Sequence, residues 1–158
     1  MGALFPGLKG MLNYHPLFVH FPIALWLAAL LFELATRLVK KESLHYAACA
    51  ALALGALAAV PAVVSGWSAE GAVPPTGPAH DVKELHESLM VTSSILSGML
   101  AVLGGFVLPR RPLGALRAAF LLGLLFLAGL AVVGADRGAL LVYHYGTGVD
   151  WPAAQSQK

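Results

Sequence analysis

Residues 47–64 have the sequence AACAALALGALAAVPAVV, which contains no charged side chain. With its flanks, this run extends from about Leu44 to Trp67 and meets the length of roughly 20 apolar residues that an α-helix needs to cross a bilayer. The apolar residues are continuous rather than alternating, which predicts a helix and argues against a strand. The segment therefore predicts a transmembrane helix, and the rest of the chain is organised in the same way.

Three further apolar runs have a similar length, at residues 16–39, 82–108 and 114–135. The chain is 58% apolar and 11% charged, whereas soluble domains usually carry about 25% charged residues. We therefore predict an all-α integral membrane protein, a single domain of residues 1–158 built as a four-helix up-down bundle. Residues 136–158 are too polar and glycine-interrupted to cross again, and we expect an ordered tail packed at the membrane interface.

Charge and cysteine content exclude several classes of protein. The formal net charge of +2 is small and dispersed, so nucleic acid is not an expected partner. Cys49 is the single cysteine, which excludes an intramolecular disulfide, a cysteine-based zinc cluster and a CxxCH motif for covalent haem attachment.

Basic residues predict the orientation of the bundle. Six of the ten fall at one end of the predicted helices: Arg37, Lys40, Lys41, Arg110, Arg111 and Arg117. The positive-inside rule places that end in the cytoplasm. We therefore expect a multi-pass protein of the bacterial inner membrane with both termini on the non-cytoplasmic side.

Five of the six histidines map to the predicted outer end: His15, His20, His80, His86 and His144. His20 and His86 each lie about one turn inside a helix, and the first and third helices of such a bundle are diagonal, so the two imidazoles are expected to face each other. At the other end, His45 is expected to be a solvated interfacial residue. Glu33 is expected to form a surface ion pair with Arg37, one turn away.

Histidines on facing helices are a usual way to hold a haem or a metal ion in a bundle. We predict haem b with His20 and His86 as axial ligands of the iron, while His144 and His15 orient these ligands or bind quinone. The protein would then be a small b-type cytochrome, an electron carrier rather than a stand-alone enzyme. Its partners would be quinone and a periplasmic or membrane redox protein.

Two other functions remain open. His86-Glu87-Ser88-Leu89-Met90 begins like the zinc-protease motif HExxH but has Met90 in place of the second histidine, so that motif fails. Met90 lies one turn from His86 and could ligate haem iron or copper. A copper or zinc site would draw on His15, His20, His86 and His144 with Met90 or Asp81. The other alternative is a cofactor-free assembly subunit of a redox complex.

Three stretches of the chain resemble a bacterial membrane family. They are the segment HPLFVHFPIAL at residues 15–25, the run GALAA at residues 55–59 and the tail LVYHYGTGV at residues 141–149, and His86 early in the third helix also fits. The family is the domain of unknown function two-two-three-one. The resemblance implies a four-helix inner-membrane protein that often occurs with cytochrome-like redox modules, and it implies no established activity. By this resemblance, the candidate site residues are His15, His20, His86 and His144. It gives no support to a role for His80 or Met90.

Overall fold

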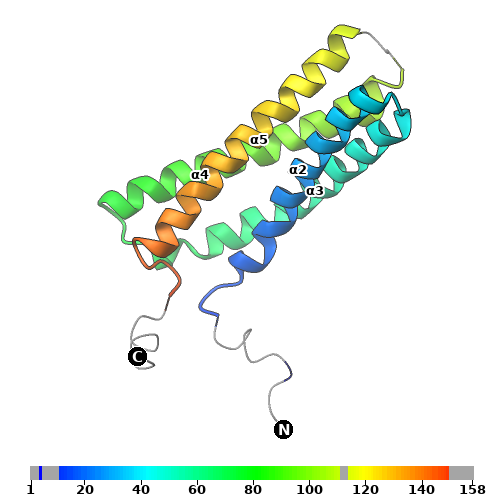
Figure 1. The fold of residues 1–158 in the computed structure, drawn as a ribbon. Helices are drawn as coiled ribbons and strands as arrows, with labels where there is room; N and C mark the ends of the chain where they lie inside the picture. The colour runs from blue at the N-terminus through cyan, green and yellow to red at the C-terminus, as the bar shows by residue number, and fades with distance from the viewer. Residues whose placement is uncertain (1–3, 5–10, 111–113, 150–158) are drawn as a thin grey trace.

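The computed structural model describes residue 4 and residues 11–110 and 114–149. Four long helices form a bundle (Figure 1): α2, His15–Val39; α3, Glu42–Ser68; α4, Pro78–Val102; and α5, Gly114–Tyr143. A 3-10 turn, η1 (Glu70–Ala72), precedes α4, and a π-helical turn, η2 (Leu103–Val107), prolongs it. No strand occurs in these described residues, so the predicted all-α fold is confirmed.

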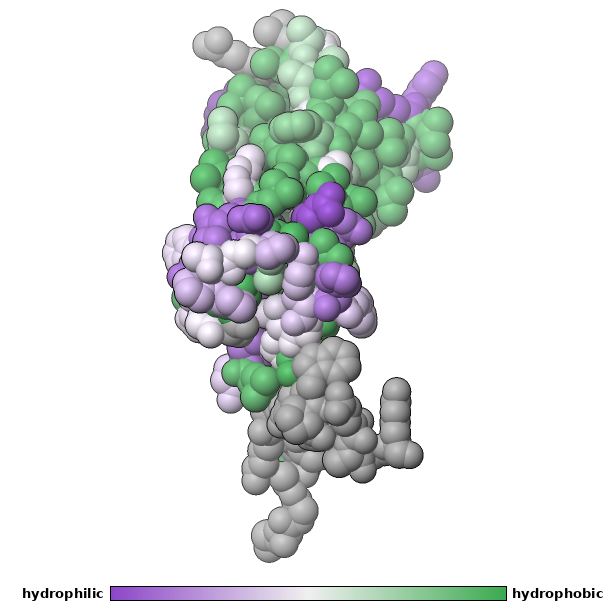
Figure 2. All heavy atoms as spheres, turned by 90° about the vertical axis from the view of Figure 1, so that its left-hand side faces the viewer, coloured by the Kyte–Doolittle hydropathy of each residue, from purple (hydrophilic) through white to green (hydrophobic). Residues whose placement is uncertain are grey.

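All four helices are long and apolar enough to span a bilayer, counting α4 together with η2. Figure 2 shows a broad apolar flank, with hydrophilic side chains gathered at the end of the bundle that faces the viewer. Large side chains such as Leu31, Phe106 and Phe126 are more than half exposed on the flank. A soluble protein rarely exposes so much contiguous apolar surface, whereas lipid requires it. The structure therefore agrees with the predicted membrane-spanning bundle.

The ends of α2 and α4 have local causes. At the end of α2, Lys40 adopts a left-handed conformation (φ +54°) and donates its N–H to the Thr36 carbonyl oxygen at 2.8 Å. The chain then turns directly into α3. At the start of α4, Gly77 has a φ of +97° and Pro78 occupies the first turn, where its missing N–H costs no helical hydrogen bond. This helix therefore begins earlier than residue 82, where we expected it.

The fourth helix differs most from expectation. It continues to Tyr143, so residues 136–143 are helical and do not belong to a tail as predicted. Gly138 does not break this helix because it packs closely against α4, and tertiary packing supplies the stability that glycine lacks. After the helix, Thr147 donates its N–H to the Leu141 carbonyl at 2.9 Å, which folds the chain back on the helix end. Residues 150–158 of the predicted tail lie outside the described residues.

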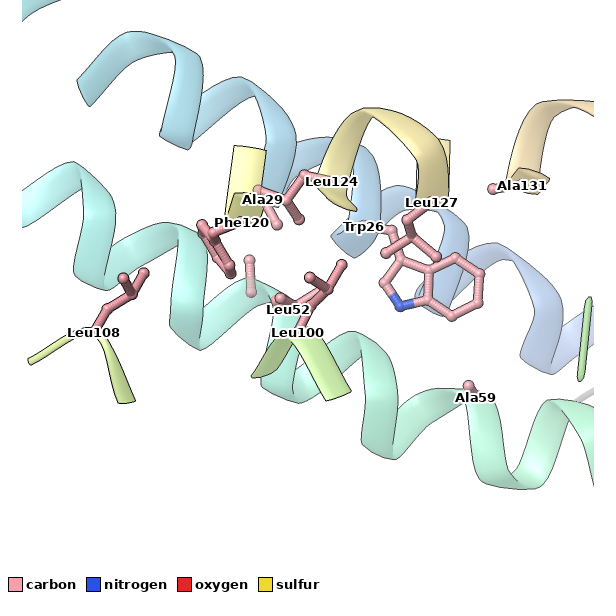
Figure 3. Packing of buried hydrophobic residues seen from close by; sticks show 11 residues of the cluster. Trp26, Ala29, Leu52, Ala59, Leu100, Leu108, Phe120, Leu124, Leu127 and Ala131 are labelled. Carbon is pink, nitrogen blue, oxygen red and sulfur yellow. The ribbon is translucent and has the colours of Figure 1, made fainter. Parts of the chain in front are cut away.

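Helices α2 and α4 are diagonal, as predicted for the first and third helices, because each packs along α3 and α5. Between them lies a buried core of Trp26, Leu52, Phe120, Leu124 and Leu127 (Figure 3). The core separates two polar ends. We call the end where α2 and α4 begin the histidine end, and the end where α3 and α5 begin the basic end.

Small residues allow the helices to approach closely. A Cβ atom added to Gly55 of α3 would lie 2.8 Å from Cδ1 of the buried Trp26 indole on α2. A Cβ added to Gly123 of α5 would lie 2.6 Å from a methyl group of Leu100 on α4. Both distances are shorter than a carbon–carbon contact allows. Glycine at these positions therefore sets the spacing of the helix pairs.

Replacing Gly55 by alanine tests this packing. The indole of Trp26 is rigid and 1% exposed, so it has no room to move away from the new methyl group. We expect Gly55→Ala to destabilise the protein by about 1–3 kcal/mol, the usual cost of overpacking a core. Gly98→Ala is the matched control, because a Cβ at Gly98 meets nothing within 4 Å. Thermal unfolding in detergent should show a lower midpoint for Gly55→Ala alone, and equal midpoints would contradict the assignment.

Candidate cofactor cavity at the histidine end

A cavity of about 620 Å³ lies between the four helices at the histidine end. Its wall is mainly apolar and includes Trp26 of α2, Ala62 of α3 and Ala139 of α5. The polar residues that line the cavity are largely histidines, together with charged residues at its rim. Among the lining residues are His15, His20 and His86, three of the four histidines that the sequence singled out as ligands.

His15 is held by α3. Its Nδ1 lies 3.0 Å from the Ala62 carbonyl oxygen and 3.2 Å from the Ser65 hydroxyl. The helix begins at His15 itself, where the Asn13 side chain accepts the backbone N–H. Gly66 leaves room for the ring, because a Cβ there would lie 3.1 Å from Cε1 of His15. The imidazole is thus fixed between α2 and α3.

His86 is held by α5 in the same manner. Its Nδ1 lies 2.7 Å from the Gly134 carbonyl oxygen. One turn further along α5, a Cβ at Gly138 would lie 2.9 Å from Cε1 of His86. The ring of His86 therefore needs glycine at this point of α5.

His15 and His86 come together from diagonal helices. Their ring centroids are 6.4 Å apart and the ring planes are nearly perpendicular, at 89°. The meeting of two imidazoles across the bundle agrees with the expected geometry, but the ring opposite His86 is that of His15 and not that of His20. Residues five apart on a helix point about 140° away from each other, so His15 and His20 cannot both face α4.

His20 is exposed, and its Nδ1 lies 2.7 Å from the Pro16 carbonyl oxygen of its own helix. It still lines the cavity. His144 follows the end of α5, is exposed, and packs edge-on against the Tyr145 ring at 4.7 Å. His80 lies 3.9 Å from Glu84 in the first turns of α4. The roles predicted for His20 and His144 therefore stay predictions, and His144 is not part of the cavity wall.

Met90 lies one turn below His86 in the cavity wall. Its sulfur packs against Gly134, where a Cβ would lie only 2.6 Å away. No group of three or more His, Cys, Asp or Glu side chains suited to a metal ion occurs within the described ranges 11–110 and 114–149. A metal ion held by protein ligands alone would thus have two imidazoles and, at most, a thioether.

A charged network that the sequence analysis missed forms the rim of the cavity. The Nζ of Lys83 lies 3.1 Å from Glu70, 2.9 Å from Glu84 and 3.1 Å from Glu87. The Trp67 indole donates to Glu87 at 2.8 Å, which ties α3 to α4. The spacing of Lys83 and Glu87, one turn apart on a helix, was the available signal for part of this network.

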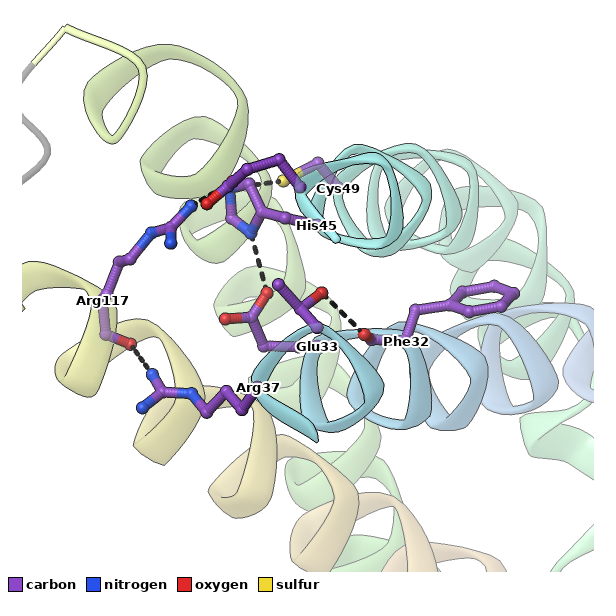
Figure 4. Close-up of polar contacts among 8 residues, drawn as sticks. Phe32, Glu33, Arg37, His45, Cys49 and Arg117 are labelled. Atoms are coloured by element: carbon purple, nitrogen blue, oxygen red, sulfur yellow. Dashed lines mark hydrogen bonds and ion pairs between the residues drawn. The ribbon is translucent and has the colours of Figure 1, made fainter. Parts of the chain in front are cut away.

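The basic end contradicts two expectations. Glu33 is 1% exposed and does not pair with Arg37 at the surface, and His45 is 3% exposed rather than solvated. The two side chains bind each other, with His45 Nδ1 2.7 Å from Glu33 Oε2 (Figure 4). Arg37 instead donates to the Arg117 carbonyl oxygen at 3.0 Å. Glu33 and His45 lie on opposite sides of the short connection between α2 and α3, which was the available signal for their pairing.

Comparison with known proteins identifies a family model described as "Predicted membrane protein (DUF2231)", which matches residues 11–151. No curated protein and no solved structure matches the chain significantly. The match covers all four helices and the histidines that line the cavity.

The contact between His86 and Gly138 yields a test of the cavity wall. We expect Gly138→Ala to push the imidazole away from α5, to break its hydrogen bond to Gly134 and to destabilise the protein by about 1–3 kcal/mol. Gly129→Ala on the same helix is the control, because nothing lies within 4 Å of a Cβ there. Thermal unfolding in detergent should separate the two variants. A Gly138→Ala protein as stable as Gly129→Ala would contradict the described position of His86.

Proposed function

Because the chain belongs to the membrane family DUF2231, whose description states no activity, we propose its function from the cavity itself: a small b-type cytochrome that binds haem b at the histidine end. The haem would be held by His86 and His15. When bound, it would supply one-electron transfer between a membrane quinol or redox partner and an acceptor at that end. The observation that carries this proposal is the pair of imidazoles 6.4 Å apart in one apolar cavity.

The hydrogen bonds of the two rings support a role as ligands. A carbonyl oxygen accepts hydrogen bonds and cannot donate them, so Nδ1 of each ring must carry the proton. In a neutral imidazole, Nε2 then keeps its lone pair. Metal-ligating histidines are oriented in this way, by a carbonyl or carboxylate that holds the other ring nitrogen. His20 has the same bond to Pro16 and is therefore an alternative ligand.

The spacing of the rings also fits a shared metal ion. A metal–nitrogen bond of about 2.0–2.1 Å on each side, plus the two ring radii, separates the centroids of two opposed imidazoles by about 6 Å. The ring centroids of His15 and His86 are 6.4 Å apart in the structure. The cavity volume of about 620 Å³ is also within the usual range of roughly 300–1,000 Å³ for sites that hold a small organic ligand.

Ligand number favours haem over zinc. A zinc ion takes three or four protein ligands, and the described residues contain no cluster of three His, Cys, Asp or Glu side chains suited to a metal. A porphyrin supplies four nitrogens of its own, so His15 and His86 would be sufficient as the protein ligands of its iron. Copper, with the thioether of Met90 as a third ligand, is the competing proposal because Met90 also lines the cavity.

Orientation in the membrane follows from charge. The basic end holds Arg37, Lys40, Lys41, Arg110 and Arg117, and the positive-inside rule would place it in the cytoplasm. The cavity would then open toward the periplasmic side of the bacterial inner membrane. Both ends of the chain would lie on that side.

The visible spectrum of the purified protein tests the proposal. Protein from haem-replete cells, or protein incubated with haemin, should give a reduced-minus-oxidised spectrum typical of a b-type cytochrome. His86→Ala and His15→Ala should each lose at least about tenfold in haem affinity, because each would remove one of the two side chains proposed to hold the haem. His80→Ala and His144→Ala are the controls, since neither residue lines the cavity.

The same experiment separates the alternatives. If His20→Ala loses haem while His15→Ala keeps it, the ligand pair is His20 and His86. Protein that stays colourless after incubation with haemin, yet holds copper or zinc in stoichiometric amount, would replace haem by that metal. If the protein binds neither haem nor metal, the remaining hypothesis is a cofactor-free assembly subunit of a redox complex.

A further inference from the structure

The buried acid and imidazole at the basic end have no part in the proposed cofactor site. Glu33 lies in the last two turns of α2, and His45 lies in the first turn of α3. Both are almost completely buried, and their contact of 2.7 Å joins the two helices. On its other side, His45 Nε2 lies 3.6 Å from Cys49 Sγ, so both ring nitrogens have partners (Figure 4). Ionisable groups are costly at such a place and are expected to have a function.

A second cavity connects this pair with the surface. It has a volume of about 340 Å³ and is lined by Glu33, Thr36, Arg37, Lys40, Glu42, Gly114 and Arg117. The carboxyl group of Glu33 binds His45 through Oε2, and no described residue forms a hydrogen bond with Oε1. The carboxyl group thus contacts the imidazole with one oxygen and belongs to the wall of a polar cavity. The cavity gives Glu33 a route to water at the basic end.

We propose that Glu33 and His45 form a proton-binding site that exchanges protons with the aqueous phase at the basic end. The ligand is a proton delivered by water through the second cavity. A hydronium ion gives up the proton and becomes water, an oxygen of the Glu33 carboxylate takes it, and the pair then shares it, so the net charge of the pair rises by one. This inference does not depend on haem, because it uses no residue of the cofactor cavity.

The chemistry of the pair favours reversible proton binding. With the carboxyl ionised and the imidazole neutral, the pair carries one negative charge in a region of low dielectric constant. Burial of an uncompensated charge is costly, and one added proton removes it. The neighbouring cations Arg37, Lys40 and Arg117 act in the opposite direction, because an added positive charge is repelled by them.

The charged and titratable groups around the pair come from three helices. Helix α2 contributes Arg37 and Lys40, α3 contributes Glu42, Tyr46 and Cys49, and α5 contributes Arg117. Arg117 is ion-paired with Glu42, and Arg37 is bound to the backbone of Arg117. Arg37, like Lys40, is therefore a cation of the cavity wall that can be removed without breaking an ion pair given for the described residues.

Nuclear magnetic resonance of histidine labelled with ¹⁵N, in nanodiscs, tests the proposal. The His45 signals are those absent from His45→Gln. In the wild type they should report uptake of one proton between about pH 5 and pH 8. In Glu33→Gln the His45 titration should move to lower pH by about one unit or more, because the carboxylate that favours the charged imidazole is gone. His45 signals that stay constant over this range, or that titrate identically in Glu33→Gln, would overturn the proposal.

A second pair of variants leaves the buried residues intact, in case Glu33→Gln does not fold. Arg37→Gln removes a cation from the wall of the cavity and should move the titration to higher pH by an amount on the order of 0.5 unit. Lys41→Gln removes a neighbouring cation that does not line the cavity and should cause a smaller change. Equal titration curves for Arg37→Gln and Lys41→Gln would contradict the proposal, because a cation of the cavity wall would then act on the pair no more strongly than a cation outside it.

Discussion

Lipid hydrocarbon offers no hydrogen-bond partner, so polar side chains on these helices are stabilised by partners inside the bundle or at its ends. This constraint explains the bonds between helices. His15 of α2 binds the backbone of α3, His86 of α4 binds the backbone of α5, and Glu33 of α2 binds His45 of α3. Each of these bonds links two neighbouring helices close to one end. The serines of α4 follow the same constraint within their own helix, since Ser93 and Ser97 donate to carbonyls three or four residues earlier.

Close packing makes these bonds possible. In lipid, helices associate through contacts between small residues rather than through the exclusion of water. Gly55 admits the Trp26 indole, and Gly138 admits the imidazole of His86. The π-helical turn η2 contains Gly104, where a Cβ would lie 2.8 Å from the Phe120 ring and 2.9 Å from Cys49. This π-helical turn therefore lies where α3 and α5 both contact the end of α4.

The resulting molecule has two polar sites divided by a dry core. Trp26, Leu52, Phe120 and Leu127, each at most 1% exposed, fill the bundle between the cofactor cavity and the Glu33–His45 pair. This division gives the two proposals separate chemistry, metal ligation at one end and proton binding at the other. Both depend on imidazoles whose orientation is set by a neighbouring helix. The cofactor cavity depends on the helix pairs α2–α3 and α4–α5, and the Glu33–His45 pair depends on α2–α3.

Hydropathy and charge in the sequence were sufficient to predict the four helices and their order. They also predicted that the bundle has two distinct ends and that most histidines lie at one of them. These features depend on composition along the chain, and the cost of exposing polar groups to lipid leaves few alternatives. The partners of each side chain were decided only by the tertiary structure. Depth along the helix suggested His20 opposite His86, but the rotation of α2 about its axis directs His15 there. Spacing within one helix suggested Glu33 with Arg37, but the packing of α3 offers Glu33 a buried imidazole. Both outcomes have one physical reason: apolar length determines that a helix crosses the membrane, whereas its rotation is determined by contacts with the other helices.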